Sequence, residues 1–261
     1  MSGNRKKSDA LTSAQVCAII DAALYSFCIG KWINRSITIH FAKGGVRPHA
    51  RRLLKDFLKH AGDWLNKRGF GPAYYIYVFE NPPDGGEHVH ILMHVPHDLW
   101  DDFQAAELRW IRKAVQKLGG KCRRGTLVDK EVFFYSAFTK GSADLSDYLI
   151  SGLRGSLLYL LKGSDVGLPA LLGIDDNEAM RLPEKLRHLP QGSILGKRVG
   201  FSESLSRQRH LFPGHEFRPG MWMAGREARA RAILRDFGLE FTAPGNRGRP
   251  TVLRPVTGPT T

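Results

Sequence analysis

Two histidines in a short, otherwise apolar stretch carry the clearest chemical potential of the chain. They stand two positions apart, as His88-Val89-His90. In a β-strand, side chains two apart point to the same face and lie about 6.5–7 Å apart at the backbone. Both imidazoles can therefore bind one cation, while Val89 points the other way, into the core.

A third ligand is predicted from the strand before the histidines. Residues 81–86, Asn-Pro-Pro-Asp-Gly-Gly, are typical of a hairpin turn. If the turn is centred near Asp84, Glu80 lies directly opposite His88 and diagonal to His90. Opposed residues share a face, so the set becomes two imidazoles and one carboxylate with coordination positions left open. Such a set suits Mg²⁺ or Mn²⁺.

Two nearby residues compete less well for a place in this site. His94 shares the face but stands about 13 Å along the strand from His90. Glu87 is adjacent to His88 and should point to the opposite face unless a bulge turns it. Two strand histidines alone are more often ordinary surface or core histidines, and it is the opposed Glu80 that favours a metal site.

A tyrosine and a lysine three positions apart, Tyr159-Leu-Leu-Lys162, supply a second constellation. On a helix, positions i and i+3 are neighbours, so the phenol and the ammonium can face one phosphate. Tyrosine is a poor nucleophile at its ordinary pKa near 10. A metal that polarises the phosphoryl oxygens, with a lysine that offsets developing charge, makes its attack feasible. Taken alone, the spacing fits a core tyrosine and a solvated lysine equally well.

The elements around these residues are predicted in the order β-α-β-β-α-β-α. This order indicates an α+β fold, an antiparallel sheet with helices packed on one face and the other face open for a ligand. A helix starting at Thr12 or Ser13 precedes it, after a polar segment 1–10 expected to be disordered. The predicted strands are 36–41, 74–80, 88–95 and 131–138, and the predicted helices are 48–67, 98–118 and 144–162.

This arrangement of motifs resembles the HUH endonuclease superfamily, specifically its replication-initiator (Rep) branch. The resemblance extends from about residue 37 to residue 162. It implies an RRM-like core that nicks single-stranded DNA with a divalent cation, links a tyrosine to the 5′-phosphate and releases a free 3′-OH. Three motifs carry it: Ser36–His40, Glu80 with His88-Val-His90, and Tyr159-Leu-Leu-Lys162.

The number of catalytic tyrosines follows from the same comparison. Tyr148 precedes Tyr159 by eleven positions, about three helical turns. Two-tyrosine members of the superfamily place their pair one turn apart, so the chain resembles a single-tyrosine enzyme, with Tyr148 packing or stacking on a base. The implied role is initiation of rolling-circle-type replication. A transposase with the same chemistry and a nucleic-acid-binding protein that does not cleave are the alternatives.

Net charge points to a polyanionic partner. The 261 residues carry a formal net charge of +14, and residues 181–261 hold 15 Lys+Arg against 6 Asp+Glu. Arginine predominates there and binds phosphate bidentately. Residues 247–250, Arg-Gly-Arg-Pro, match the core of an AT-hook, a match short enough to arise by chance. The candidate DNA-binding residues are Arg187, Lys197, Arg198, Arg207, Arg209, Arg247 and Arg249.

Three parts of the chain are expected. An N-terminal tail and helix occupy 1–30, the HUH nuclease core 31–165, and a basic DNA-binding extension with a flexible tail 166–261. The alternative is that the residues after 163 complete the core. The segment Gln191–Arg198 lacks the first glycine and the final Ser/Thr of a phosphate loop. The expected substrate is single-stranded or hairpin DNA, and any unwinding must come from a separate helicase, from supercoiling or from a substrate that is already single-stranded.

Cysteine content and hydropathy indicate the compartment. The three cysteines form no Cys-x-x-Cys pair, which argues against a disulfide framework and a thiolate zinc site and favours the reducing cytoplasm. The apolar stretch Val16–Ile29 is interrupted by Asp21 and is too short to span a bilayer, so no membrane association is expected.

Overall fold

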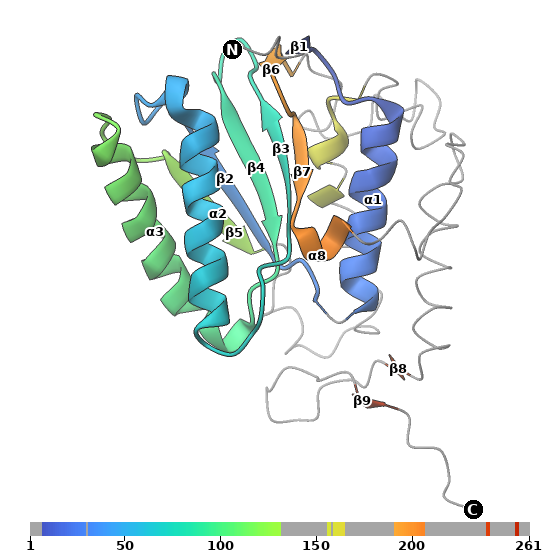
Figure 1. Cartoon of the computed structure of the whole chain (residues 1–261). Helices are drawn as coiled ribbons and strands as arrows, with labels where there is room; N and C mark the ends of the chain where they lie inside the picture. The colour runs from blue at the N-terminus through green and yellow to red at the C-terminus, as the bar shows by residue number, and fades with distance from the viewer. Residues whose placement is uncertain are drawn as a thin grey trace, which may run out of the picture.

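A five-stranded antiparallel sheet forms the centre of the molecule (Figure 1). The computed structural model describes residues 7–29, 31–131, 156–157, 159–164, 191–206, 239–240 and 254–255. The predicted α+β class is confirmed, with the spatial strand order β5-β2-β4-β3-β7. The strands are β2 (Arg35–His40), β3 (Tyr75–Glu80), β4 (His88–Met93), β5 (Leu127–Glu131) and β7 (Val199–Phe201).

Helices, helical residues at 156–157 and 159–161, and two small strand pairs complete the described part. No helix within these described ranges is long and apolar enough to cross a membrane. The helices are α1 (Ser13–Cys28), α2 (Ala50–Asn66), α3 (Trp100–Lys117) and α8 (Glu203–Ser206), with 3₁₀ turns at Arg47–His49 and His97–Leu99. The small pairs are β1 (Lys7–Ser8) with β6 (Ile194–Leu195), and β8 (Leu239–Glu240) with β9 (Arg254–Pro255).

The two faces of the sheet differ in what covers them. Figure 1 shows α2 and α3 on one side and α1 on the other. Alternate residues such as Ile39 and Val89 point toward α2 and α3 and form the main apolar core with Phe57 and Phe103. The expectation of helices on one face only is therefore incomplete, because α1 contacts β3 from the second face.

The start of α1 shows how local sequence sets an element. Thr12 caps the helix as predicted: its Oγ1 accepts a hydrogen bond from Gln15 N at 3.3 Å, and Gln15 Oε1 accepts one from Thr12 N at 3.0 Å. This reciprocal pair is a capping box. The helix then buries Val16 and Ile19, which lie one turn apart on the same face.

Two local predictions were wrong. β5 begins at Leu127, whereas a strand was predicted only from 131, and the residues after 131 lie outside the described part. The strand was not predicted at 127–130 because of Asp129 and Lys130. Asp129 faces the core, and a charged residue at such a position breaks the apolar alternation that indicates a strand. Lys7–Ser8, expected to be disordered, pair with Ile194–Leu195.

Residues assigned to the basic extension contribute to the sheet. Val199–Phe201 form β7 and pair with β3, and Ile194, Val199 and Leu205 are buried. The guanidinium of Arg198 is buried, and it donates to the carbonyl oxygens of Ser8 and Gly192, each at 2.6 Å. This segment thus ties the N-terminal strand to the edge of the sheet.

A variant ending at Gly163 should lose the fold, whereas one ending at Ser206 should keep it. The shorter variant loses β7 and three buried aliphatic side chains, worth about 5–9 kcal/mol together. That is comparable to the whole stability of a typical domain, about 5–15 kcal/mol. Soluble yield and thermal unfolding followed by circular dichroism compare the two. Equal melting temperatures would show that β7 adds nothing to the core.

A buried charged network joins α3 to the far end of β2. The Arg35 guanidinium forms an ion pair with Asp129, with Nε to Oδ1 at 3.0 Å, and both side chains are buried. Glu107 of α3 has no exposed surface. Burial, followed by the negative charge of the nearby Asp129, raises the pKa of Glu107 to about 9.

The raised pKa of Glu107 makes stability depend on pH. In the unfolded chain this carboxyl ionises near 4.5, so its contribution is complete below that pH and is lost as pH rises toward 9. We expect the melting temperature to fall between pH 5 and pH 9, and to fall less in Glu107→Gln. Calorimetric melts of both proteins across this range measure it, and parallel curves would contradict the assignment.

Candidate metal centre

The register of the β3–β4 hairpin positions the three predicted ligands. Glu80 pairs with His88 and Val78 pairs with His90, as predicted from the turn. The turn requires Gly86, whose φ is +63° and where a Cβ would lie 2.8 Å from the Cβ of Ala42. This register puts Glu80, His88 and His90 on the face opposite α2 and α3, and Val89 in the core.

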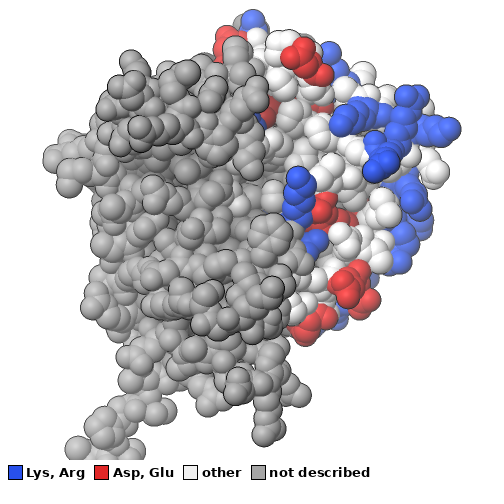
Figure 2. All heavy atoms as spheres, turned by 180° about the vertical axis from the view of Figure 1, so that it is seen from behind, with Lys and Arg blue, Asp and Glu red and all other residues white. Residues whose placement is uncertain are grey.

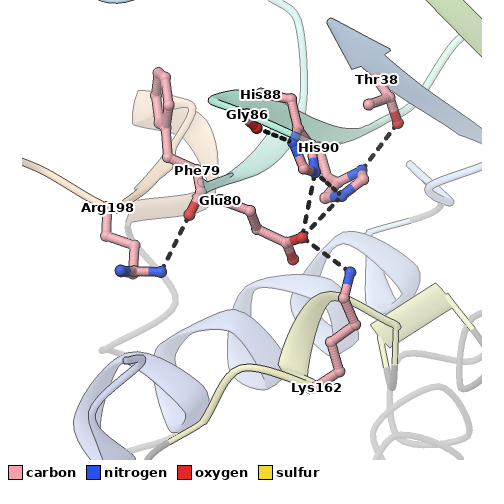
Figure 3. Close-up of polar contacts among 8 residues, drawn as sticks. All are labelled: Thr38, Phe79, Glu80, Gly86, His88, His90, Lys162 and Arg198. Carbon is pink, nitrogen blue, oxygen red and sulfur yellow. Dashed lines mark hydrogen bonds and ion pairs between the residues drawn. The ribbon is translucent and has the colours of Figure 1, made fainter. Parts of the chain in front are cut away.

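The three side chains converge on one point (Figure 3). Glu80 Oε2 lies 3.3 Å from the Nε2 atoms of both His88 and His90, and the two Nε2 atoms are 3.1 Å apart. One ligand atom from each residue lies within 4.8 Å of the other two. All three residues are buried. The cluster could hold a metal ion.

Hydrogen bonds to the outer nitrogens orient both imidazoles. His88 Nδ1 lies 2.8 Å from the carbonyl oxygen of Gly86, which can only accept, so Nδ1 carries the proton. His90 Nδ1 lies 2.9 Å from Thr38 Oγ1 on β2. A cation bound at this site would take the Nε2 lone pair of each ring, with the ring proton on Nδ1 held by these partners. Partners of this kind fix the tautomer of metal-binding histidines.

The electrostatics of the cluster favour an ionised carboxylate at Glu80. Burial alone would raise the pKa of Glu80, but hydrogen bonds from His88 and His90 and the charges of His90 and Lys162 outweigh it and lower that pKa. Burial lowers the pKa of His90 despite the attraction of Glu80. Glu80 Oε1 is buried without a hydrogen-bond partner among the described residues. A buried carboxylate oxygen without a partner, beside two imidazole nitrogens, offers the kind of ligand atoms that a divalent cation binds.

The segment around Tyr159 and Lys162 lies against this cluster, although it is about 70 residues away in sequence. The Lys162 ammonium donates to Glu80 Oε2 at 2.9 Å and lies 3.7 Å from the centre of the Tyr159 ring. That ring packs edge to face on His90, with centroids 5.0 Å apart. Lys162 thus contacts the carboxylate directly, a contact that its spacing from Tyr159 alone does not predict.

Strand β2 contributes two residues that sequence reasoning did not assign to the site. Thr38 bonds His90, and the His40 ring lies 4.9 Å from the ring of His88. Their alternation along the strand was visible in the sequence, but the pairing of β2 with β4 was not. Burial and the charges of His88, Lys43 and His90 lower the pKa of His40 to about 4.

The competing ligands lie elsewhere. Glu87 forms an ion pair with Arg47 at 3.7 Å, and His94 Nδ1 bonds the carbonyl oxygen of Trp32 at 2.7 Å. Neither belongs to the cluster.

Of the predicted DNA-binding residues, only Lys197 and Arg198 lie in the described part of the chain. Lys197 is exposed, whereas Arg198 has only 1% of its surface exposed and is used in backbone hydrogen bonds, which leaves it almost no surface for DNA. Outside the described part of the chain lie Tyr148, Arg187, Arg207, Arg209, Arg247 and Arg249.

Comparison of the chain with protein-family models, with curated proteins and with solved structures found no significant match.

The cluster should bind Mn²⁺ in solution, and Thr38 should strengthen that binding through His90. Isothermal calorimetry of the wild type, Glu80→Gln and Thr38→Val measures this. We expect Glu80→Gln to abolish binding, and Thr38→Val to weaken it about 10–100-fold, as loss of an orienting hydrogen bond does. Glu87→Gln is the matched control and should bind as the wild type does. A larger effect at Glu87 than at Glu80 would refute the assigned ligand set.

Proposed function

We propose that the protein is a metal-dependent endonuclease of the HUH type that nicks and joins single-stranded DNA through a covalent 5′-phosphotyrosine. Mg²⁺ or Mn²⁺ is the proposed cofactor, held by Glu80, His88 and His90, with Tyr159 as the single nucleophile. Its biological role would be that of a replication initiator of the rolling-circle type.

One observation carries the proposal: a tyrosine packs directly against a buried cluster of two histidines and a carboxylate. Tyr159 contacts His90 through its ring, and Lys162 of the same turn bonds Glu80. A metal site that served only stability would need neither a half-buried phenol nor a lysine beside its carboxylate. The proposed nucleophile, the ammonium proposed to stabilise a phosphate and the proposed cation site are thus in direct contact with one another.

The chain path supports the same proposal. From β2 to β5 the elements follow one another as β-α-β-β-α-β, and these four strands lie in the order β5-β2-β4-β3, all antiparallel. This is the order expected of the RRM-like core that the sequence resemblance implies. The metal ligands lie on two neighbouring strands of this sheet, Glu80 on β3 and both histidines on β4.

The proposed reaction conserves bonds and protons. The Tyr159 hydroxyl oxygen attacks the phosphorus of a DNA phosphodiester, the bond from phosphorus to the 3′ oxygen breaks, and the phenolic proton is passed on to that leaving oxygen. The products are a tyrosine–5′-phosphate diester and a free 3′-OH, and the reverse reaction joins the strand. Glu80, His88 and His90 would hold the divalent cation, which when bound would polarise the phosphoryl oxygens. Lys162 holds Glu80 in place and adds positive charge beside the phosphate.

Substitution of the nucleophile tests the proposal. Tyr159→Phe removes the hydroxyl and keeps the ring that packs on His90, so the fold and metal binding should survive while the DNA adduct disappears. Labelled single-stranded DNA is incubated with protein and Mn²⁺, and the adduct is read on a denaturing gel. The wild type should form an adduct that depends on the metal, and should leave relaxed duplex DNA uncut.

Two other tyrosines serve as controls. Tyr77→Phe changes a half-buried tyrosine on the opposite face, and Tyr148→Phe removes the other tyrosine considered from the sequence. Both should form adduct at the wild-type level. An adduct mapped to Tyr148 by mass spectrometry would refute the assignment of Tyr159. Binding of single-stranded DNA without any adduct would favour a protein that does not cleave.

A further inference from the structure

Two loops meet at the end of the sheet where the metal ligands lie. β2 ends at His40, β3 ends at Glu80 and β4 begins at His88, and β5 begins beside them at Leu127. The loop after β2, residues 41–46, and the loop before β5, residues 119–126, therefore emerge next to the metal centre. Neither loop is needed to supply a metal ligand.

Four exposed cations occur in these two loops. They are Lys43, Lys121, Arg123 and Arg124, called here the basic rim. The ammonium of Lys43 lies next to the second loop: a Cβ added at Gly125 would be 3.4 Å from Lys43 Nζ. Among the described residues none of the four forms an ion pair with Asp or Glu. Figure 2 shows Lys and Arg side chains gathered on the side of the molecule where α3 and β5 lie.

The backbone that carries the basic rim is held tightly. The Lys121 amide donates to the carbonyl oxygen of Gly44 at 3.1 Å, and the His40 amide donates to that of Thr126 at 2.8 Å. Gly120 packs so closely that a Cβ there would lie 2.3 Å from the Gly44 oxygen. Thr126 Oγ1 accepts from the Arg123 amide at 2.9 Å. Four like charges are thus kept together by fixed loops, although they repel one another.

The other side of the first loop is tied to the metal centre. The Phe41 amide donates to the carbonyl oxygen of Glu87 at 3.1 Å, next to His88 in sequence. The His40 ring packs against that of His88. A polymer that extends from the metal centre toward β5 therefore meets His40 first and the basic rim next.

We infer that the basic rim of Lys43, Lys121, Arg123 and Arg124 binds the sugar-phosphate backbone of the single-stranded DNA as it leaves the metal centre. The inference rests on the proposed function for the identity of the polymer. Unpaired, exposed cations on a rigid support match a chain of phosphates, and arginine can bind each phosphate bidentately. The rim lies on the core itself, whereas the sequence had directed attention to the C-terminal third.

Salt dependence of binding tests the rim. The variant is Lys43→Gln, Arg123→Gln and Arg124→Gln combined, and the control is Arg109→Gln, Arg112→Gln and Lys113→Gln, exposed positions on α3 across the sheet. Both lose three charges. Fluorescence anisotropy with a labelled 20-nucleotide single strand, in EDTA to prevent cleavage, gives the affinity from 50 to 200 mM NaCl.

The rim variant should show a slope of log K against log salt about 2 units shallower than the wild type, at about 0.7 per phosphate contact. Its deficit in affinity should accordingly shrink about 20-fold between 50 and 200 mM salt. The control should keep the wild-type slope. Because all these side chains are exposed, both variants should melt as the wild type does. Equal slopes for variant and control, or a wild type that binds no single strand, would overturn the inference.

Adduct formation with Mn²⁺ at saturating DNA separates this inference from the proposed function. If the wild type forms adduct but the rim variant keeps the wild-type slope, the rim inference fails and the nuclease stands. If no protein forms adduct but the slope changes as expected, the rim is a nucleic-acid contact and the nuclease proposal fails.

Discussion

A buried carboxylate is the constraint on which this structure depends. Glu80 is 2% exposed, and an ionised carboxylate removed from water is costly unless it is paired and hydrogen-bonded. Two imidazoles and the Lys162 ammonium meet that requirement, and they come from β4 and from a segment far along the chain. Removing one partner of such a buried pair typically costs about 3–5 kcal/mol. The same contacts that make the charge tolerable therefore assemble the candidate metal centre.

The sheet separates stability from chemistry by its two faces. Because side chains alternate along a strand, Val89 packs under α2 and α3 while His88 and His90 point the other way. The apolar face holds the strands in register, and the register keeps Glu80 opposite His88. A shift of one residue would send the histidines into the apolar core. The positions of the three candidate metal ligands therefore depend on hydrophobic packing on the opposite face of the sheet.

Contacts between distant parts of the sequence extend the core beyond the region that the motifs define. Arg198 joins the backbone of Ser8 and Gly192, and Arg51 of α2 donates to the carbonyl oxygens of Lys197 and Leu195. Both arginines, one of which looked like a DNA contact, are used internally here. Guanidinium groups suit this role, since their several donors can satisfy several carbonyl oxygens at once. Charge composition alone does not distinguish a structural arginine from one that binds a polyanion.

The sequence by itself determined what depends on local periodicity: the β3–β4 hairpin with its register, the positions of the helices α1, α2 and α3, and the choice of Glu80 over Glu87. Only the tertiary structure decided that β2 pairs with β4 and brings Thr38 and His40 to the site, that β7 joins the sheet, and that Lys162 bonds Glu80. The tertiary structure also showed that β5 begins at Leu127. This strand accommodates the buried charge of Asp129 because Asp129 forms an ion pair with Arg35 of β2. Turn length and the alternation of side chains depend on residues that are neighbours in the sequence. The contacts of Thr38, His40, Lys162 and Asp129 join segments that are far apart in the sequence, so they depend on how the whole chain packs.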